Sequence, residues 1–303
     1  MALRERVAWL DLSSRGKIRV TGDDRVRLLH AMTTNHIERL KPGEGCYAFF
    51  LNAQGRIICD VNLFSFEDRI LLDTEPETLV QLFAHLDRYI IADDVTIEDE
   101  TDRTCTIGVE GPEAEAVLAR LGASVPDAPY STAAWATRTV ARLSSTGSDG
   151  YFLFAPASEK TELMGQLSEA GAVAASPDDA RIIRIEHGRP RYGEEITDRH
   201  LVQETDQLHA VHFTKGCYVG QEIVERVRSR AQIHRVLRRL EIETAEAPAA
   251  GTKLKSGESD AAVIASAAFS PALRKTVALA NVRVDFAEPG TELLLGDIRA
   301  LVC

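Results

Sequence analysis

Residues 215–222, KGCYVGQE, combine a lysine, a cysteine and two glycines directly before a stretch with the pattern of a helix. A buried structural cysteine needs only an apolar pocket, whereas Cys217 has a cation, Lys215, two residues away. Positive charge and a helix N-terminus both favour the thiolate, and glycine permits close approach of a ligand. Cys217 and Lys215 are therefore candidate catalytic residues in a reactive-thiol site or a ligand-binding turn. The alternative is a cysteine packed under a structural turn.

The other four cysteines are Cys46, Cys59, Cys105 and Cys303. They are widely spaced and form no CxxC pair, so neither a disulfide framework nor a zinc or iron–sulfur ligand set is expected. The segment HAVH (209–212) offers two histidines at a spacing that is weak for zinc. We interpret these as surface or capping histidines and predict no metal site.

An arginine-rich segment follows the octapeptide. Residues 226–239, RVRSRAQIHRVLRR, hold six arginines in a chain whose formal net charge is -11. The segment is either a solvated face or an anion site, because guanidinium groups bind carboxylates and phosphates in bidentate fashion. The overall negative charge argues against wrapping of nucleic acid. No GxGxxG or GxxxxGK fingerprint of a nucleotide site is present.

The chain composition is that of an ordinary globular protein, with 303 residues, 45% hydrophobic and 27% charged. No apolar run approaches the length of a bilayer span, and the first residues lack the apolar stretch of a signal peptide. We therefore expect a cytosolic protein without a membrane partner.

The residue patterns predict a mixed α and β organisation. A strand is expected at 17–20, a helix capped by Asp23 through residue 32, and a hairpin from 46–51 and 57–64. Further helices are expected after Pro76, Pro112 and Ser158, and over 178–188. After residue 236 short β-type runs alternate with Gly, Pro, Ser and Asp, which is typical of a small antiparallel barrel. We therefore expect an α+β fold with two parts, residues 1–235 and 236–303.

Four segments, in order, carry a family resemblance. KGCYVGQE resembles the signature octapeptide of the YgfZ family, folate-binding proteins involved in iron–sulfur cluster maturation and tRNA modification. The wider chain resembles the glycine-cleavage aminomethyltransferase superfamily in YAFFLNAQGRIICD (47–60), RIEHGRPRYGEE (184–195) and AAFSPALRKTVALANV (267–282). The resemblance implies a multi-lobed aminomethyltransferase-like folate-binding fold, with two α+β lobes around a central channel and a C-terminal antiparallel β-barrel.

The resemblance also implies a binding site for tetrahydrofolate or another reduced folate. The family's pterin-binding glutamate matches Glu186, and the tyrosine before its LN pair matches Tyr47. We expect the glutamyl tail of folate to lie near basic side chains. The full set expected to bind folate is Glu186, Tyr47, Asp60, Lys215, Gln221, Arg226 and Arg228.

Departures from the family pattern concern the acidic chemistry. Alignment with the family's LNxxGGxxDD segment puts Cys59 at the first aspartate, so only the second is retained, as Asp60. A glycine is replaced by Arg56, and the family's GYTGE segment appears as SSTGS (144–148). We therefore expect the folate pocket to be kept and ordinary aminomethyl transfer to be lost.

Three functions remain open. The first is a folate-dependent accessory factor for iron–sulfur cluster assembly or repair that acts through Cys217, with client or assembly proteins as partners. It would support cluster enzymes, including tRNA-modifying ones. The second is a tetrahydrofolate-dependent one-carbon transferase or demethylase, which the loss of the acid at Cys59 disfavours. The third is a tRNA-binding protein using the arginine run, which the net charge disfavours.

Overall fold

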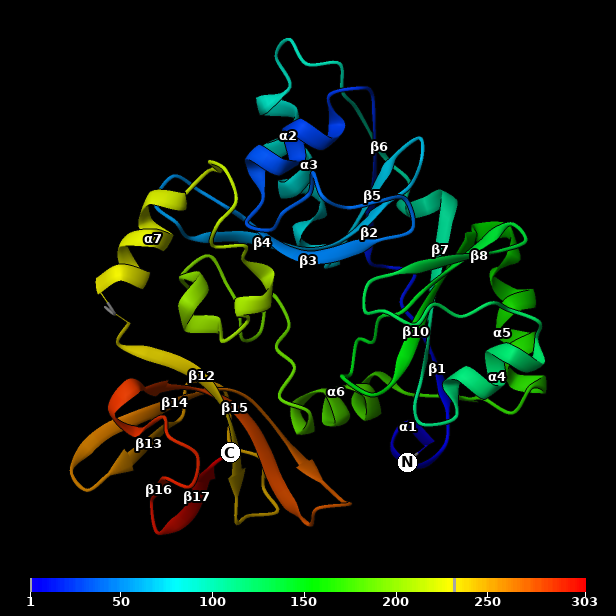
Figure 1. Ribbon diagram of the computed structural model, residues 1–303. Coiled ribbons are helices and arrows are strands. Elements are labelled where there is room, and N and C mark those ends of the chain that lie inside the picture. Colours follow the sequence, from blue (N-terminus) through cyan, green and yellow to red (C-terminus); the bar gives the residue numbers. More distant parts are fainter. Residues whose placement is uncertain (1, 231–232) are drawn as a thin grey trace.

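The hairpin predicted between residues 46 and 64 forms one edge of a five-stranded antiparallel sheet in the computed structural model, which describes residues 2–230 and 233–303 (Figure 1). Two helices, α2 (Arg25–Met32) and α3 (Leu79–Tyr89), cover one face of this sheet, where Leu29 and Leu82 pack on the apolar strand residues. In spatial order the strands are β3 (Gly45–Leu51), β4 (Ile57–Ser65), β5 (Ile70–Thr74), β2 (Gly16–Thr21) and β6 (Thr96–Asp99).

A six-stranded sheet forms the second lobe, and its strands were not among the predicted elements. Helices α4 (Ala114–Arg120) and α5 (Lys160–Glu169) pack on it through Leu118 and Leu163. The outer strand β11 runs parallel to β1, and the other pairs are antiparallel. The spatial order is β11 (Val173–Ala174), β1 (Ala8–Asp11), β7 (Thr104–Glu110), β10 (Gly150–Pro156), β9 (Arg138–Ala141) and β8 (Thr132–Trp135).

The C-terminal part is a closed antiparallel barrel, as predicted from its short β-type runs. Its small interior is filled by alanine, valine and leucine side chains that alternate with exposed polar ones along the strands. The barrel order is β12 (Arg235–Ile242), β15 (Lys275–Arg283), β14 (Ser259–Ser270), β13 (Lys253–Ser256), β16 (Glu292–Leu295) and β17 (Ile298–Val302). The α+β class with a C-terminal barrel is confirmed.

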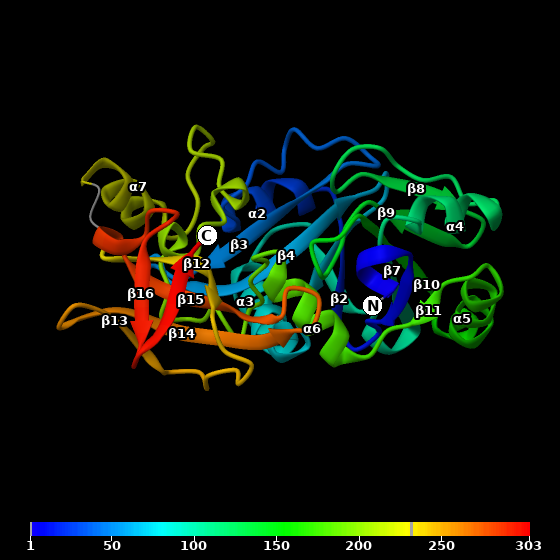
Figure 2. The same cartoon turned by 90° about the horizontal axis from the view of Figure 1, so that it is seen from below.

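Helix α6 (Pro177–Glu186) lies between the barrel and the six-stranded sheet, close to α1 (Ala2–Glu5) (Figures 1 and 2). Ser176 caps α6 by accepting a hydrogen bond from the Asp179 backbone N–H at 3.1 Å. Ile183 packs toward α1 and β1, whereas Ile185 packs on the barrel. Because α6 is apolar on both sides, it joins the two parts of the chain.

The remaining segments connect these units. Helix α7 (Gln221–Arg230) begins at the last two residues of the octapeptide and confirms the helix expected there. Short 3₁₀ turns occupy η1 (Pro76–Thr78), η2 (Thr101–Arg103), η3 (Ala157–Glu159), η4 (Val202–Thr205), η5 (Leu208–Ala210) and η6 (Val284–Phe286). No helix among the described residues is both long and apolar enough to cross a bilayer.

Two predicted helix starts differ in detail. The helix expected to be capped by Asp23 begins at Arg25, and the preceding residue, Asp24, makes no side-chain cap. The Asp24 carboxylate instead accepts a hydrogen bond from the Asp94 backbone at 3.0 Å. The helix expected at Ser158 starts after the turn η3, because that turn uses residues 157–159.

Candidate active site

A cavity of about 510 Å³ lies where the two sheets meet α6. Strand β1 and the residues after it line one side, and β3 and β4 line another. The segment 144–146, the start of α6 and residues 189–194 complete the wall. The polar groups that project into this cavity therefore come from segments far apart in the sequence.

Asp60 is one of the acidic residues that line the cavity. It is paired with Phe49 across the β3–β4 ladder, and the hydroxyl of Tyr47 donates to its Oδ2 at 2.7 Å. Its Oδ1 is buried and has no hydrogen-bond partner among the described residues. Burial raises the pKa of Asp60 to about 6, with Glu75 adding repulsion, while the Tyr47 hydroxyl and the Arg15 guanidinium oppose the shift. One carboxylate oxygen of this cavity-lining residue is thus left without a donor from the described chain.

Asn62 lies two residues further along β4 and therefore faces the same side of the sheet. Its amide NH₂ donates to Asp73 at 2.7 Å, and Arg15 holds that aspartate through Nε at 2.9 Å and Nη2 at 2.8 Å. This chain of contacts fixes the Asn62 amide so that Oδ1 is left buried without a partner in the described chain. Asp60 and Asn62 both line the cavity, and each holds one buried oxygen acceptor that no donor of the described chain satisfies.

Aromatic side chains form a flat wall beside Asp60. The rings of Tyr47 and His209 are stacked, with centroids 5.3 Å apart and planes inclined by 23°. Burial lowers the pKa of His209, and the charge of Arg189 lowers it further. Phe152 of β10 also lines the cavity. These groups provide an apolar surface against which a planar ring can pack.

Arg189 supplies a cationic group at the cavity. Within the described part of the chain no carboxylate lies within 4 Å of its guanidinium. The other arginines of the cavity are paired: Arg15 with Asp73 and Glu75, Arg181 with Glu194, Arg184 with Glu194 and Glu195, and Arg191 with Glu75 and Glu77. Arg189 is therefore the guanidinium best placed to bind an anionic group of a ligand.

The segment SSTGS also contributes to the cavity through Ser144, Ser145 and Thr146. A fully buried carboxylate from β7, Glu110, anchors it and accepts from the backbone N–H of Ser145 at 2.7 Å and of Thr146 at 3.0 Å. The segment therefore lines the cavity with short hydroxyl-bearing side chains.

Cys59 does not occupy an acidic position in this cavity. Side chains alternate across a strand, so Cys59 and Asp60 point to opposite faces of β4. The thiol is fully buried against α2, where Leu29 and Met32 pack, and burial raises its pKa well above the ordinary value. The acidic side chain that faces the cavity is Asp60, which the chain retains. The expectation that the site lost its acid at Cys59 is therefore wrong.

The structure brings together two of the seven residues expected to bind folate, Tyr47 and Asp60. Glu186 lies at the end of α6, where its carboxylate contacts the Arg4 guanidinium and accepts from the Ser270 hydroxyl. Glu186 is 7% exposed and does not line the cavity. Its contacts join the N-terminal helix to the barrel, and its role in folate binding stays a prediction.

Lys215 is buried away from the cavity, against the end of α2. Its ammonium donates to the backbone carbonyls of His30, Thr33 and Asn35, the last two at 2.6 and 2.8 Å. Burial lowers its pKa to about 8. Cys217 is exposed two residues later and does not line the cavity. Lys215 thus holds the loop that carries Cys217.

The other candidates lie on α7, outside the cavity lining. Gln221 begins the helix, and Arg226 lies within it. Arg228 pairs with Glu225 at 2.8 Å, and its guanidinium lies 5.2 Å from the ring centroid of Phe213. The arginine run is divided between α7 and β12, and residues 231–232 within it lie outside the described chain.

Sequence reasoning missed Asn62, Arg189 and the cavity-facing ring of His209. The period-2 alternation of a strand that contains Asp60 could have identified Asn62, because residues two apart share a face. No local pattern distinguishes Arg189 from its neighbouring arginines.

The GCVT N-terminal domain model matches residues 1–215. The chain belongs to this family. An aminomethyltransferase of Rubrobacter xylanophilus is 30% identical over 301 residues, which cover 97% of this chain and 80% of that protein. An aminomethyltransferase of Streptomyces coelicolor is 30% identical over 99% of this chain and 84% of its own length.

A chloroplastic protein of Arabidopsis thaliana, named as a transferase, is 30% identical over 73% of this chain, which spans 53% of that protein. Among solved structures, the glycine cleavage system aminomethyltransferase T from Bartonella henselae superposes with a TM-score of 0.89 at 23% identity, covering 99% of this chain and 85% of that one. The aminomethyltransferase fold is therefore shown for this chain.

Proposed function

We propose that the protein is a tetrahydrofolate-dependent one-carbon transferase of the aminomethyltransferase type, and that the cavity holds the reduced folate. The observation that carries this proposal is Asp60, a buried carboxylate in the cavity wall with one oxygen that has no partner among the described residues. The names of the relatives support the same reading.

The donor and acceptor groups of the cavity fit a reduced folate. The unpartnered oxygens of Asp60 and Asn62 can accept from the amino and ring N–H groups of a pterin. The stacked rings of Tyr47 and His209 offer a face for its plane, and Arg189 can bind a glutamyl carboxylate. The proposed folate-binding residues are therefore Tyr47, Asp60, Asn62, Arg189 and His209.

Bound tetrahydrofolate would supply the nucleophilic nitrogen that accepts the one-carbon unit. Above its pKa of about 6, Asp60 is ionised and can accept a proton from that nitrogen. The same carboxylate can stabilise positive charge on an incoming aminomethyl group, since the surroundings are dry. Tyr47 keeps the carboxylate oriented through its hydroxyl.

The test combines a binding and a rate measurement. Calorimetry with tetrahydrofolate should give a single site, and the wild-type protein should convert tetrahydrofolate and S-aminomethyldihydrolipoamide into methylenetetrahydrofolate, dihydrolipoamide and ammonia. The rate should fall below about pH 6, where Asp60 becomes protonated. Asp60→Asn should lower the rate by at least a hundredfold, as loss of a general base typically costs about 10²–10⁴.

The matched control is Asp297→Asn, which removes an exposed aspartate in the turn between β16 and β17. Its rate and affinity should equal those of the wild type. If Asp60→Asn keeps the wild-type rate, Asp60 is not the acid–base group. If the wild-type protein binds no reduced folate, the proposal fails as a whole.

A second candidate is a folate-dependent accessory role in iron–sulfur cluster assembly or repair, with the YgfZ-type octapeptide as its basis. Cys217 favours it, because this cysteine is exposed whereas Cys59 and Cys105 are buried. The role would include client or assembly proteins as partners and a link to tRNA modification through cluster enzymes.

Complementation of cells that lack the protein separates the two candidates. Under the accessory role, Cys217→Ser should lose support of cluster enzymes while methylenetetrahydrofolate formation continues. Full complementation by Cys217→Ser would remove this candidate and leave the transferase proposal untouched, since the two residues lie at different places.

A further inference from the structure

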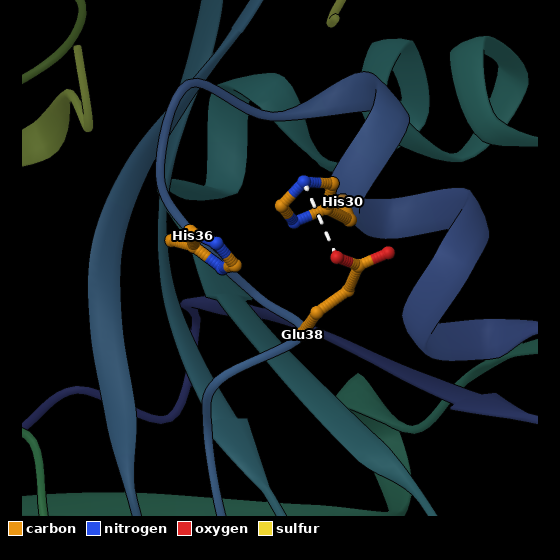
Figure 3. Close-up of side chains that lie close together, drawn as sticks. All are labelled: His30, His36 and Glu38. Atoms are coloured by element: carbon orange, nitrogen blue, oxygen red, sulfur yellow. Dashed lines mark ion pairs between the residues drawn. The ribbon is translucent and has the colours of Figure 1, made fainter. Parts of the chain in front are cut away.

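Two histidines and a glutamate lie close together in a cluster (Figure 3). The cluster adjoins the octapeptide loop, since the Lys215 ammonium donates to the backbone carbonyl of His30. His30 comes from α2, and His36 and Glu38 come from the segment between α2 and β3. None of the three lines the cavity. The proposed transferase chemistry therefore gives this cluster no role.

The geometry of the cluster is convergent. One candidate ligand atom from each residue lies within 4.8 Å of the other two, and His30 Nε2 is 3.7 Å from a Glu38 carboxylate oxygen. The rings of His30 and His36 have centroids 4.6 Å apart. Around a tetrahedral zinc ion, neighbouring ligand atoms are about 3.4 Å apart, given Zn–N bonds of about 2.0–2.1 Å. Glu38 is exposed, so rotation of its side chain can shorten the distances between its carboxylate and the two histidines toward this value.

Polar atoms of both rings are unsatisfied. The Nδ1 atoms of His30 and His36 are buried and have no hydrogen-bond partner in residues 2–230 and 233–303. His30 is 7% exposed, so its imidazole is held in a nearly dry setting. Neither ring is therefore tied to the described chain through Nδ1, which leaves a ring nitrogen of each histidine free for a ligand.

The surroundings select the class of ion. Lys215 and Arg39 act on these histidines as positive charges, so a cation bound only by its charge would be repelled. A single carboxylate is also too few oxygen ligands for calcium or magnesium. Imidazole nitrogens form coordinate bonds with zinc, iron, copper and nickel ions. Two imidazoles and a carboxylate are therefore suited to a divalent transition ion.

We propose that His30, His36 and Glu38 bind a divalent first-row transition-metal ion at the junction of α2 and the octapeptide loop. Three protein ligands leave the remaining coordination positions to water, on the exposed side where Glu38 lies. His212 packs edge-on against His36, with ring centroids 4.9 Å apart, and so fixes the plane of that ring.

The octapeptide loop is structurally coupled to this site. Lys215 donates to the backbone carbonyl of His30, and the backbone N–H of Val219 donates to the carbonyl of Ala31 at 3.2 Å. Occupation of the site should therefore order the segment that carries Cys217.

The experiment uses the tag-free full chain after treatment with a chelator. Calorimetry with zinc chloride should give one site per chain, and cobalt chloride should give the absorption bands of a four- or five-coordinate ion. His36→Gln and Glu38→Gln should each weaken zinc binding at least tenfold. Both residues are partly or fully exposed, so these variants should fold, which circular dichroism checks.

The matched control is His234→Gln, which removes an exposed histidine near the start of the barrel. It should bind zinc as the wild type does. A tenfold loss in either cluster variant with no loss in the control supports the site. The absence of zinc binding by the wild type, or affinities within twofold of wild type in both cluster variants, would overturn it. Folate binding should be equal in all these proteins, since the cluster is outside the cavity.

Discussion

Replacement of Asp60 with asparagine should make the protein more stable while it removes activity. The carboxylate has a pKa of about 6 in the folded protein, compared with the ordinary value of 3.8. The folded state therefore holds the Asp60 proton more tightly than the unfolded chain does. Stability from this group is fully present below pH 3.8 and is lost as the pH rises through about 6.

The magnitude follows from the same two values. Each unit of pKa difference corresponds to about 1.36 kcal/mol, so the raised pKa lowers the stability of the folded protein by about 3 kcal/mol at pH 8 and by about 2 kcal/mol at pH 5, relative to a group that stays neutral. Asparagine has nearly the same shape, is neutral at both pH values, and its amide oxygen can still accept from Tyr47. The variant should therefore exceed the wild type by these amounts.

Urea unfolding at pH 5 and pH 8, followed by circular dichroism, measures the difference. Asp297→Asn serves again as the control, because it removes one negative charge from an exposed turn. A gain in the free energy of unfolding that is larger at pH 8 than at pH 5 supports a raised pKa of the buried Asp60 carboxylate. An equal difference at both pH values, or a less stable variant at pH 8, would refute the reasoning.

Three further predictions concern residues outside the cavity. Glu186→Ala should lower the free energy of unfolding by about 1.5–3 kcal/mol, since it removes a charged hydrogen-bond partner of Arg4 and Ser270. Calorimetry on the same variant tests the predicted pterin contact. A tenfold loss of folate affinity supports that contact, and an unchanged affinity removes it. Lys215→Met should lower the free energy of unfolding by about 1–3 kcal/mol, because three backbone carbonyls lose their donor. Urea unfolding measures this change, and an unchanged stability would mean that water replaces the ammonium. Iodoacetamide should alkylate Cys217 before the other four cysteines, because it alone among them is exposed; peptide mass spectrometry showing an earlier label elsewhere would contradict the described loop.

The β3–β4 hairpin, the helix after Pro76 and the C-terminal barrel could be predicted from the sequence, because each depends on local patterns of apolar residues and turns. The α-helix itself begins at Leu79, since Pro76–Thr78 form a 3₁₀ turn. Motif resemblance identified Tyr47 and Asp60, which both lie in the cavity. The six-stranded sheet was missed, since its strands pair segments as distant as β1 and β11.

Tertiary structure decided which of the motif residues share a site. The direction of each side chain separates Asp60 from Cys59, and α6 turns Glu186 toward Arg4 and Ser270 rather than into the cavity. Motif spacing gives only the order of residues along a chain. A site depends also on which distant segments pack together and on which face of its strand or helix each side chain lies. For the same physical reason, the convergence of His30, His36 and Glu38 appears only when the chain between α2 and β3 has folded back on the helix.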